Sequence, residues 1–287
     1  MQEGLVVLAT SIRIGKNFCP GFRIRRFLGR GSFGSVWEAE REEDRRFFAL
    51  KFIPCHDNGN PSQEIRILQI VRQLCHPHLI QIEQVWCHRG YIGITMELAD
   101  GSLQDLLDAY QGEFGTPLAA QDVCQYLTQT AAALDFLNAR QHAVGNQCVA
   151  LQHCDVKPSN LLLCGETIKI TDFGLASMMN TPHATHRRAG TFAYAAPEIF
   201  RGRLSDRSDQ YALAVTYCQL RGGRMPFPDP PQANLDQYSR PAPDLSMLPK
   251  NEQAVVARAL SPVPQDRWPS CQEMMRQLSG PHSASKN

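Results

Sequence analysis

The stretch HCDVKPSN, residues 153–160, places a carboxylate, an ammonium group and an amide within six positions. These groups belong to Asp155, Lys157 and Asn160, and a run of three leucines follows them. A carboxylate can act as a general base, a lysine can contact a phosphate, and an amide oxygen suits a hard cation such as Mg²⁺. Each residue alone is more often a turn or capping residue. Together they suggest a site that handles a phosphate.

A second acidic stretch, IKITDFG at residues 168–174, supplies another candidate metal ligand. Its alternating apolar residues predict a strand that leads to Asp172, and Gly174 frees the turn that follows. Carboxylate and amide oxygens at strand ends suit Mg²⁺. We therefore expect Asp172 to share a cation with Asn160.

A glycine-rich stretch, GRGSFGSV at residues 29–36, lies between two predicted strands. Gly29, Gly31 and Gly34 would let the backbone approach a bulky anion and present N–H groups to it. A flexible hairpin is the alternative explanation, and the pattern alone is weak evidence. Because no helix follows and no βαβ unit is evident, a dinucleotide-binding fold is disfavoured.

Lys51 occupies an unusual place in FFALKFI, residues 47–53, where it alternates with apolar residues on one face of a strand. Burying a lysine is costly unless it is paired. Glu64 is a candidate partner because it shares one helical stripe with Leu68 and Val71. Separately, a lysine that reaches solvent and a solvated glutamate would be the simpler explanation. Together, the two misplaced charges suggest an ion pair that faces a cleft.

The elements that position these residues begin with a strand-rich part. Residues 22–53 predict three strands, with a polar hairpin turn at residues 41–46. Pro61 then opens a helix, since proline suits the first helical position. Two more strands are predicted in HPHLIQIEQVW and GYIGITMEL, so this part ends near residue 97.

The later part of the chain predicts mostly helices and loops. A helix is expected to start at Thr116-Pro117, with one apolar face formed by Val123, Leu127, Leu134 and Leu137. The proline-rich residues 226–249 predict a loop, and the tail 279–287 is expected to be disordered. A small strand-rich lobe therefore precedes a larger helical lobe, and a cleft between two such lobes commonly binds a ligand.

Composition narrows the class of protein. The chain has 287 residues, of which 43% are hydrophobic and 20% charged, and its net charge is +1. This balance argues against a general nucleic-acid or membrane-surface binder. The 10 cysteines include no Cys-x-x-Cys pair, which favours free, mostly buried thiols in a reducing compartment. No apolar stretch is long enough to cross a bilayer and no signal-peptide pattern is seen. We expect a cytoplasmic protein, or one domain of a longer, anchored protein.

The order of these motifs resembles the signature of eukaryotic-type (Hanks-type) serine/threonine protein kinases. Glycine loop, strand lysine, helix glutamate, HCDVKPSN, DFG and then APE at residues 196–198 follow one another as in that family. The resemblance covers residues 22–278 and implies an α+β, bilobal protein kinase fold. Its N-lobe would span about residues 22–97 and its C-lobe about residues 102–278. DVKPSN and GTFAYAAPE resemble the serine/threonine class, and the general style looks bacterial.

The resemblance implies ATP and Mg²⁺ as cofactors and serine or threonine hydroxyls of proteins as substrates. Asp155 would accept the hydroxyl proton and Lys157 would contact the γ-phosphate, while Asn160 and Asp172 would hold Mg²⁺. Lys51 would hold the α- and β-phosphates and pair with Glu64. Met96 resembles the gatekeeper. The implied ATP-binding residues are Leu28, Gly29, Gly31, Gly34, Val36, Ala49, Lys51, Met96, Glu97, Ala99 and Leu162.

The resemblance also implies supporting roles. Thr191 would belong to the substrate platform, the substrate-binding loop within GTFAYAAPE at residues 190–198. Asp209 would brace the catalytic loop, and Glu198 and Arg267 would form a structural ion pair. The sequence departs from the family at Cys154, where many such kinases have an arginine that binds a phosphate on the activation loop. Cysteine brings no such charge, so we expect activity without activation-loop phosphorylation.

Two other functions remain in view at the level of sequence. A pseudokinase would signal by shape alone, but it would lack an equivalent of Lys51, Asp155 or Asp172, and none is missing. A small-molecule phosphotransferase of related fold is disfavoured by the glycine loop and GTFAYAAPE. The substrate, the activating signal and the oligomeric state are not indicated by the sequence.

Overall fold

The structure is a computed structural model that describes residues 21–31, 34–54, 61–88, 90–144, 146–178, 192–230 and 238–280. The chain divides into two compact units, with the boundary between residues 99 and 100. His76–Leu79 belongs to the second unit although it precedes Ile80–Ala99 of the first. The prediction of an α+β chain, in which a small strand-rich part is followed by a larger helical part, is confirmed.

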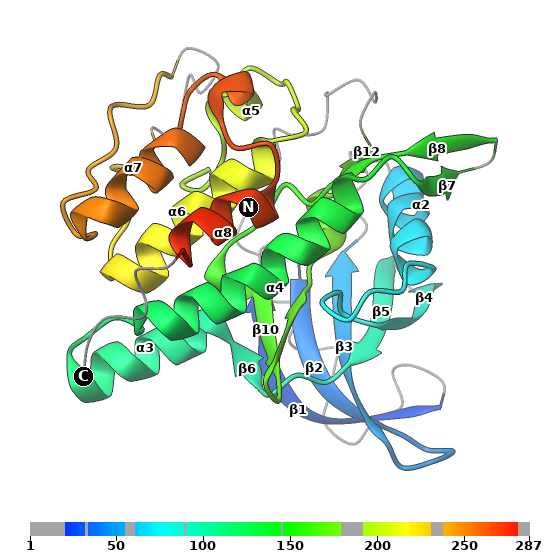
Figure 1. Ribbon diagram of the computed structural model, residues 1–287. Helices are drawn as coiled ribbons and strands as arrows, with labels where there is room; N and C mark the ends of the chain where they lie inside the picture. Colours follow the sequence, from blue (N-terminus) through cyan, green and yellow to red (C-terminus); the bar gives the residue numbers. More distant parts are fainter. Residues whose placement is uncertain are drawn as a thin grey trace. The chain divides into compact units, whose positions relative to one another are not determined.

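The strand-rich unit is built on a five-stranded antiparallel sheet of order β1-β2-β3-β5-β4 (Figure 1). The predicted polar turn joins β2 to β3, and it is closed by the Arg41 N–H, which donates to the Arg46 carbonyl at 2.8 Å. Helix α2 packs against β4. The bounds are β1 Phe22–Gly31, β2 Gly34–Arg41, β3 Phe47–Pro54, α2 Pro61–Arg72, β4 Ile82–His88 and β5 Tyr91–Glu97.

The two faces of this sheet differ in character. One face carries a buried cluster of Phe22, Ile24, Trp37, Ala39, Phe48, Leu50 and Phe52. Trp86 packs against this cluster, and its ring meets Phe52 edge-on at 5.7 Å between centroids. Since side chains alternate along a strand, Ala49 and Lys51 of β3 point to the opposite face. Both faces of β3 are therefore occupied, and only Phe47 at its start is exposed.

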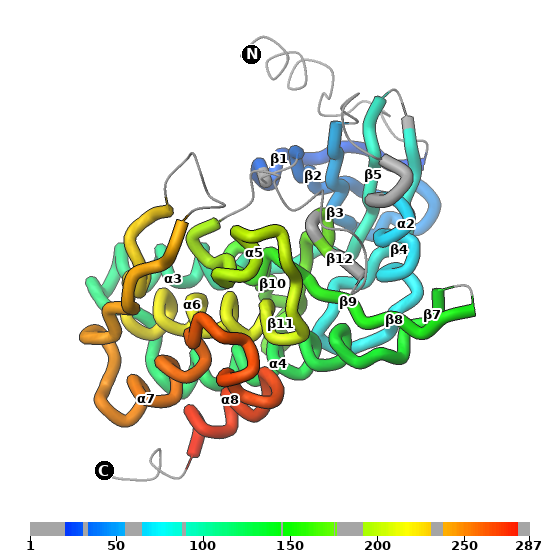
Figure 2. The backbone as a smooth tube through the Cα atoms, turned by 90° about the horizontal axis from the view of Figure 1, so that it is seen from above, coloured from blue at the N-terminus to red at the C-terminus, as the bar shows by residue number. Residues whose placement is uncertain are grey.

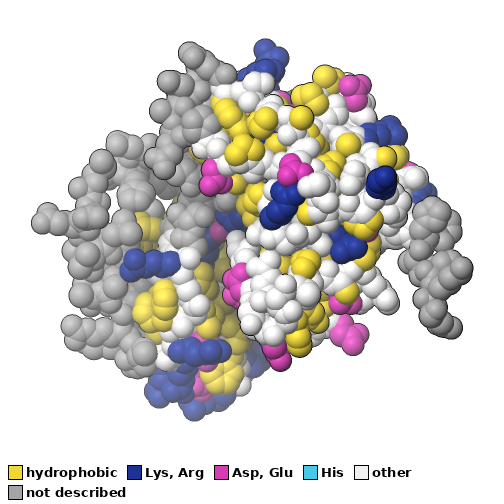
Figure 3. All heavy atoms as spheres, turned by 90° about the vertical axis from the view of Figure 1, so that its left-hand side faces the viewer, with side chains coloured by type: hydrophobic (Ala, Val, Ile, Leu, Met, Phe, Trp, Pro, Cys, Tyr) yellow, Lys and Arg dark blue, Asp and Glu magenta, His cyan; other side chains and the backbone are white. Residues whose placement is uncertain are grey.

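Arginines on the strand-rich unit are paired with acids on β2. Glu40 is buried and forms ion pairs with both Arg25 and Arg45. Arg26 contacts Glu38 at 2.8 Å. On the face drawn in Figure 3, blue and magenta side chains are interspersed, in keeping with the net charge of +1.

The helical unit carries short strands that shape its loops. A three-stranded sheet of order β11-β10-β6 and the pair β12-β9 lie among the helices, and the β7-β8 hairpin extends away from them in Figures 1 and 2. The helices are α3 Leu103–Phe114, α4 Ala120–Asn138, α5 Pro197–Phe200, α6 Ser208–Gly222, α7 Lys250–Ala259 and α8 Cys271–Leu278. The strands are β6 Gly101–Ser102, β7 His142–Val144, β8 Gln147–Val149, β9 Leu151–Gln152, β10 Leu161–Cys164, β11 Thr167–Ile170 and β12 Ser177–Met178.

Helix α6 is the centre of this unit. It is buried almost all round, with polar residues such as Thr216 that hydrogen-bond inside the fold. Helix α4 packs against α6 and α8 through its predicted apolar face, and Val123, Leu127, Leu134 and Leu137 are all buried. Because α6 is buried on every side, polar side chains on any of its faces can hydrogen-bond to the segments packed around it.

One helix boundary and one whole helix in the helical unit differ from the sequence-based prediction. Helix α4 begins at Ala120 rather than at residues 116–117. Helix α3 was not predicted, although the Ser102 hydroxyl and the Asp105 carboxylate form a capping box at its start and Gly115 ends it with φ +66°. The proline-rich stretch is irregular over residues 226–230 and 238–249, as predicted.

None of the helices in the described residues has the length and apolar character that a membrane crossing requires.

The expectation that the thiols are mostly buried is wrong for the described cysteines. All of those cysteines are free, but Cys75, Cys87 and Cys148 are exposed and only Cys218 and Cys271 are fully buried. Cys75 follows helix α2, Cys87 lies near the end of β4 and Cys148 lies in the β7-β8 hairpin, so apolar neighbours in sequence do not ensure burial.

Candidate active site

Asn160 and Asp172 lie close together along the backbone at the open end of the β10-β11 hairpin, opposite its turn. A short 3-10 turn, Pro158–Asn160, leads directly into β10, where Leu161 pairs with Ile170 of β11. One step further out, the Thr171 N–H donates to the Asn160 carbonyl at 3.0 Å. Asp172 follows immediately. Antiparallel pairing thus places two side chains that are 12 positions apart in sequence at one hairpin end.

The carboxylate of Asp155 is held by two donors from its own loop. Lys157 Nζ and Asn160 Nδ2 each lie 2.8 Å from Asp155 Oδ2. All three side chains are buried, with residue exposures of 5–7%. Both contacts use Oδ2, so Oδ1 is the oxygen that remains to accept a proton from a reacting group. The lysine also supplies the positive charge that a buried carboxylate requires.

The loop that carries Asp155 is tied to helix α6 through Asp209. The two carboxylate oxygens of Asp209 accept the backbone N–H groups of His153 and Cys154 at 2.7 and 2.8 Å. Burial raises the pKa of Asp209, and the hydrogen bonds from these two backbone N–H groups oppose that shift. A buried carboxylate that accepts two backbone donors fixes the loop conformation, because breaking either bond would leave a buried group unsatisfied.

His153 joins the two stretches that carry the candidate acids. Its Nε2 lies 2.9 Å from the Thr171 carbonyl, and its Nδ1 lies 3.3 Å from the Asp155 N–H. This pattern requires the tautomer with hydrogen on Nε2. The His153 ring also meets the Phe173 ring edge-on, with 5.1 Å between centroids. Sequence reasoning assigned no role to His153 or Phe173, although both stand inside the motifs that it singled out.

The side chains at the hairpin end fit a hard divalent cation. Because Asn160 Nδ2 is committed to the Asp155 carboxylate and carbonyl, its Oδ1 is the amide atom left for a cation. Asp172 adds a carboxylate from a left-handed backbone conformation, φ +68°. Such a conformation is unfavourable outside glycine and is often retained at functional sites. An amide oxygen beside a carboxylate is an oxygen donor set of the kind that Mg²⁺ prefers.

Cys154 also has a left-handed backbone, with φ +66°. Its thiol lies 3.6 Å from the Gln152 carbonyl. Burial raises the pKa of the thiol, and the charges of Asp209 and Asp155 raise it further. The thiol therefore stays protonated near neutral pH. A redox switch, in which oxidation of this thiol would block the neighbouring base, is therefore disfavoured, since thiolates rather than thiols react.

In the strand-rich unit, the predicted nucleotide-binding residues gather on one face of the sheet. Residues paired across antiparallel strands share a face. Val36 pairs with Lys51, and Ala49 pairs with Met96. This is the face opposite the aromatic cluster, and Lys51 is only 5% exposed on it. The unit thus presents a buried ammonium group beside small and apolar side chains.

The glycines of GRGSFGSV have different surroundings. A Cβ added at Gly29 would meet no atom within 4 Å, so open space lies above it. A Cβ at Gly34 would lie 1.9 Å from the Phe52 carbonyl oxygen, so Gly34 is required by the close approach of β2 to β3. Gly31 ends β1, and Glu64 lies within α2, but the side-chain surroundings of both fall outside the described residues.

The remaining predicted nucleotide-binding residues are distributed between the units. Leu28 is 38% exposed in β1, and Glu97 ends β5 with its N–H donated to the Gln81 carbonyl at 3.1 Å. Ala99 is the last residue of the strand-rich unit. Leu162 lies in β10 of the helical unit, half-buried and paired with Ser102.

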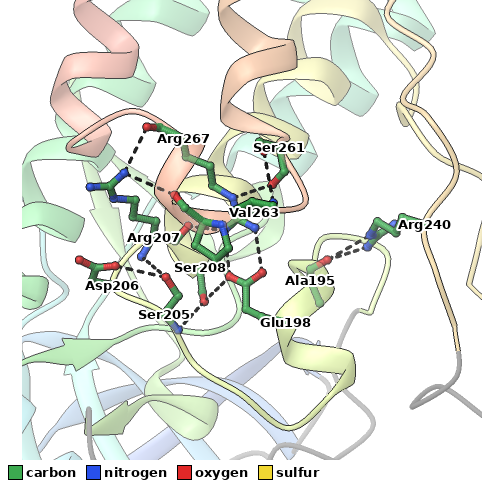
Figure 4. Close-up of polar contacts among 11 residues, drawn as sticks. Ala195, Glu198, Ser205, Asp206, Arg207, Ser208, Arg240, Ser261, Val263 and Arg267 are labelled. Carbon is green, nitrogen blue, oxygen red and sulfur yellow. Dashed lines mark hydrogen bonds and ion pairs between the residues drawn. The ribbon is translucent and has the colours of Figure 1, made fainter.

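Glu198 and Arg267 form a buried bidentate ion pair, with both N–O distances at 2.8 Å (Figure 4). The Ser208 hydroxyl donates to the same carboxylate. The Arg267 guanidinium also donates to the carbonyls of Ser261 and Arg207, so each of its three nitrogens donates at least one hydrogen bond. This network fixes helix α5, which follows the predicted substrate platform.

Tyr194 lies in that platform and was missed by the sequence-based prediction. Its hydroxyl donates to Gln219 of α6. Burial raises the Tyr194 pKa to about 12, and the charge of Asp155 contributes to the rise. The Tyr194 hydroxyl therefore lies within range of the charge on the candidate base. Thr191 itself lies outside the described residues.

Every known protein compared below with this chain is a protein kinase or a protein kinase domain. Residues 22–278 match the family described as "Protein kinase domain". The serine/threonine-protein kinase PknF of Mycobacterium tuberculosis is 31% identical over 279 residues, which cover 90% of this chain and 56% of that protein. CBL-interacting protein kinase 4 of Oryza sativa subsp. japonica is 30% identical over 269 residues, with 88% and 56% covered. This chain thus spans about half the length of these curated relatives.

A solved structure is similar over a greater share. The crystal structure of the Mycobacterium tuberculosis PknI kinase domain superposes with a TM-score of 0.71 at 27% identity. The superposition covers 94% of this chain and 98% of that one.

Proposed function

Because this chain belongs to the protein kinase domain family, we propose that it transfers the γ-phosphoryl group of ATP to serine or threonine hydroxyls of protein substrates. The observation that carries the proposal is the Asp155–Lys157–Asn160 cluster, which is buried, mutually hydrogen-bonded and braced by Asp209. Serine/threonine-protein kinases among the relatives support the substrate class.

Asp155 is the proposed base. Its Oδ1 accepts the proton of the acceptor hydroxyl while that oxygen forms a bond to the γ-phosphorus. The bond from the γ-phosphorus to the oxygen that bridges it to the β-phosphorus breaks, and ADP leaves with the bonding electron pair. Lys157 is held against Asp155, and from there its ammonium group can offset the charge on the transferred group.

Asn160 and Asp172 are proposed to hold Mg²⁺, which neutralises charge on the phosphates when it is bound. In the strand-rich unit, Lys51 would contact the α- and β-phosphates and pair with Glu64. The adenine would meet the sheet face that carries Val36, Ala49 and Met96. The register that places these side chains and Lys51 on one face supports this assignment.

The proposed setting is the cytoplasm. Support comes from the described cysteines, all of which are free and three of which are exposed. Exposed free thiols persist where the compartment is reducing.

The first test concerns the metal ligand. For the wild-type protein we expect ATP to bind more tightly in Mg²⁺ than in EDTA. Asp172→Asn should reduce that advantage by at least about tenfold, because even disturbing a ligand's partner commonly costs this much metal affinity. Titration calorimetry in both buffers measures the difference. Asp229→Asn, a change to an exposed carboxylate, is the control. Undiminished Mg²⁺ dependence in Asp172→Asn would exclude that residue as a ligand.

The second test concerns Cys154, which brings no fixed positive charge beside Asp155. We expect the double change Thr181→Ala and Thr185→Ala, assayed after phosphatase treatment, to keep activity within about twofold of wild type, because no arginine here needs a loop phosphate as partner. Both threonines lie outside the described residues. A large drop that acidic residues at either site restore would mean that another basic group binds a loop phosphate.

A further inference from the structure

Arg240 reaches from the proline-rich stretch into the segment that precedes α5. Its Nε donates to the Ala195 carbonyl at 3.1 Å (Figure 4). Its Nη2 lies within 2.6–2.9 Å of the carbonyls of Phe192, Ala193 and Ala195. One guanidinium group thus binds three of the four backbone carbonyls of residues 192–195.

The guanidinium lies among three aromatic rings, which together form an aromatic seat for it. Its central carbon lies 4.7 Å from the ring centroid of Phe227, 5.2 Å from that of Phe200 and 5.8 Å from that of Tyr211. Burial lowers the Arg240 pKa, which indicates that the cation has lost much of its hydration. Desolvated cation–π contacts and charge-assisted hydrogen bonds are stronger than their exposed counterparts. The aromatic seat and the carbonyls therefore hold Arg240 in place together.

The segment held in this way is anchored to the same helix as the loop of the candidate base, since Gln219 and Asp209 both belong to α6. Tyr194, in its middle, is anchored to Gln219 of α6 and is affected by the charge of Asp155. Its far end enters α5, which is fixed by the Glu198–Arg267 pair. Arg240 binds the carbonyls of Phe192 and Ala193, which precede Tyr194, and of Ala195, which follows it. A protein substrate must bring its hydroxyl to Asp155, so this backbone is placed to receive the residues around that hydroxyl.

We propose that Arg240 is a positioning residue for protein substrates, which fixes the backbone of residues 192–195 and thereby sets peptide affinity without affecting ATP affinity. The inference rests on the proposed role of this segment as the substrate platform. Lysine is not equivalent to arginine here, because an ammonium group lacks the second nitrogen, Nε, that donates to the Ala195 carbonyl and the planar group that packs against the rings.

The test compares Arg240→Met and Arg240→Lys with Arg224→Met. Arg224 is a matched control, since it lies near the same stretch but forms an exposed ion pair with Asp244 at 2.8 Å. For Arg240→Met we expect the peptide KM to rise by about tenfold or more, the usual effect of losing charge-assisted hydrogen bonds. The ATP KM should stay within about twofold. Hydrogen exchange of the backbone amides of residues 192–196 should be faster in the same variant.

Arg240→Lys keeps a cation in the aromatic seat, so it should fold like the wild type and still show a raised peptide KM. Arg224→Met should match the wild type in both measurements. Wild-type exchange in Arg240→Met, or an equal rise in the peptide and ATP KM values, would overturn the inference. Faster exchange with an unchanged peptide KM would also overturn it, and would place the error in the platform role rather than in the contact that Arg240 makes.

Discussion

Replacing Asp155 with asparagine is expected to lower the turnover number by roughly 10²–10⁴-fold, the usual contribution of a positioned general base. The substituted amide has the same shape but cannot accept the hydroxyl proton. Its oxygen can still accept hydrogen bonds from Lys157 and Asn160, which in the wild type both contact Asp155 Oδ2. The loop should therefore keep its conformation, and ATP affinity should change little.

Single-turnover kinetics with ATP and an acceptor protein, combined with a separate ATP titration, measure the two effects. Asp229→Asn provides the control for losing one carboxylate at an exposed position. If Asp155→Asn lost ATP affinity but kept its turnover, the assignment of Asp155 as the base would be wrong.

Replacing Lys51 with methionine is expected to abolish measurable phosphoryl transfer. Positioning and charge stabilisation of the phosphates supply most of the catalysis in this reaction class, and Lys51 is the proposed source of both in the strand-rich unit. Methionine has a similar volume and suits the buried position on β3, so the fold should be retained. Glu64→Gln should have a smaller effect, because an amide can still accept a hydrogen bond.

Phosphate incorporation over a long incubation is the sensitive measurement for Lys51→Met. Lys250→Met, at the exposed start of α7, is the matched control and should behave like the wild type. Near-normal incorporation in Lys51→Met would mean that another lysine contacts the phosphates and that the assignment of β3 is wrong.

The sequence allowed much of the strand-rich unit to be predicted, because its strands alternate clearly and its turns are polar. The predicted turn at residues 41–46 and the start of α2 at Pro61 match the structure. Helix α3 was missed although its capping box was readable in GSLQD. Because α3 begins directly after β6, the hydrophobic pattern changes from strand to helix spacing without an intervening loop.

The candidate site was predictable to the extent that its residues are contiguous in sequence. Asp155, Lys157 and Asn160 share one short loop, so their contacts follow from local geometry. Arg240 could not be found in this way, because its partners are backbone carbonyls and aromatic rings. Such partners leave no spacing pattern, and a proline-rich stretch has no period that reveals which side chain turns inward.

The proposed function is phosphorylation of serine and threonine through Asp155. Its decisive test is incubation with labelled ATP, Mg²⁺ and a generic basic protein, followed by mapping of the phosphorylated sites. We expect phosphoserine or phosphothreonine with the wild-type chain and a loss of at least about 100-fold in label with Asp155→Asn. Absence of label with a wild-type chain that binds ATP would exclude the proposed function, and label that persists undiminished in Asp155→Asn would exclude Asp155 as the base.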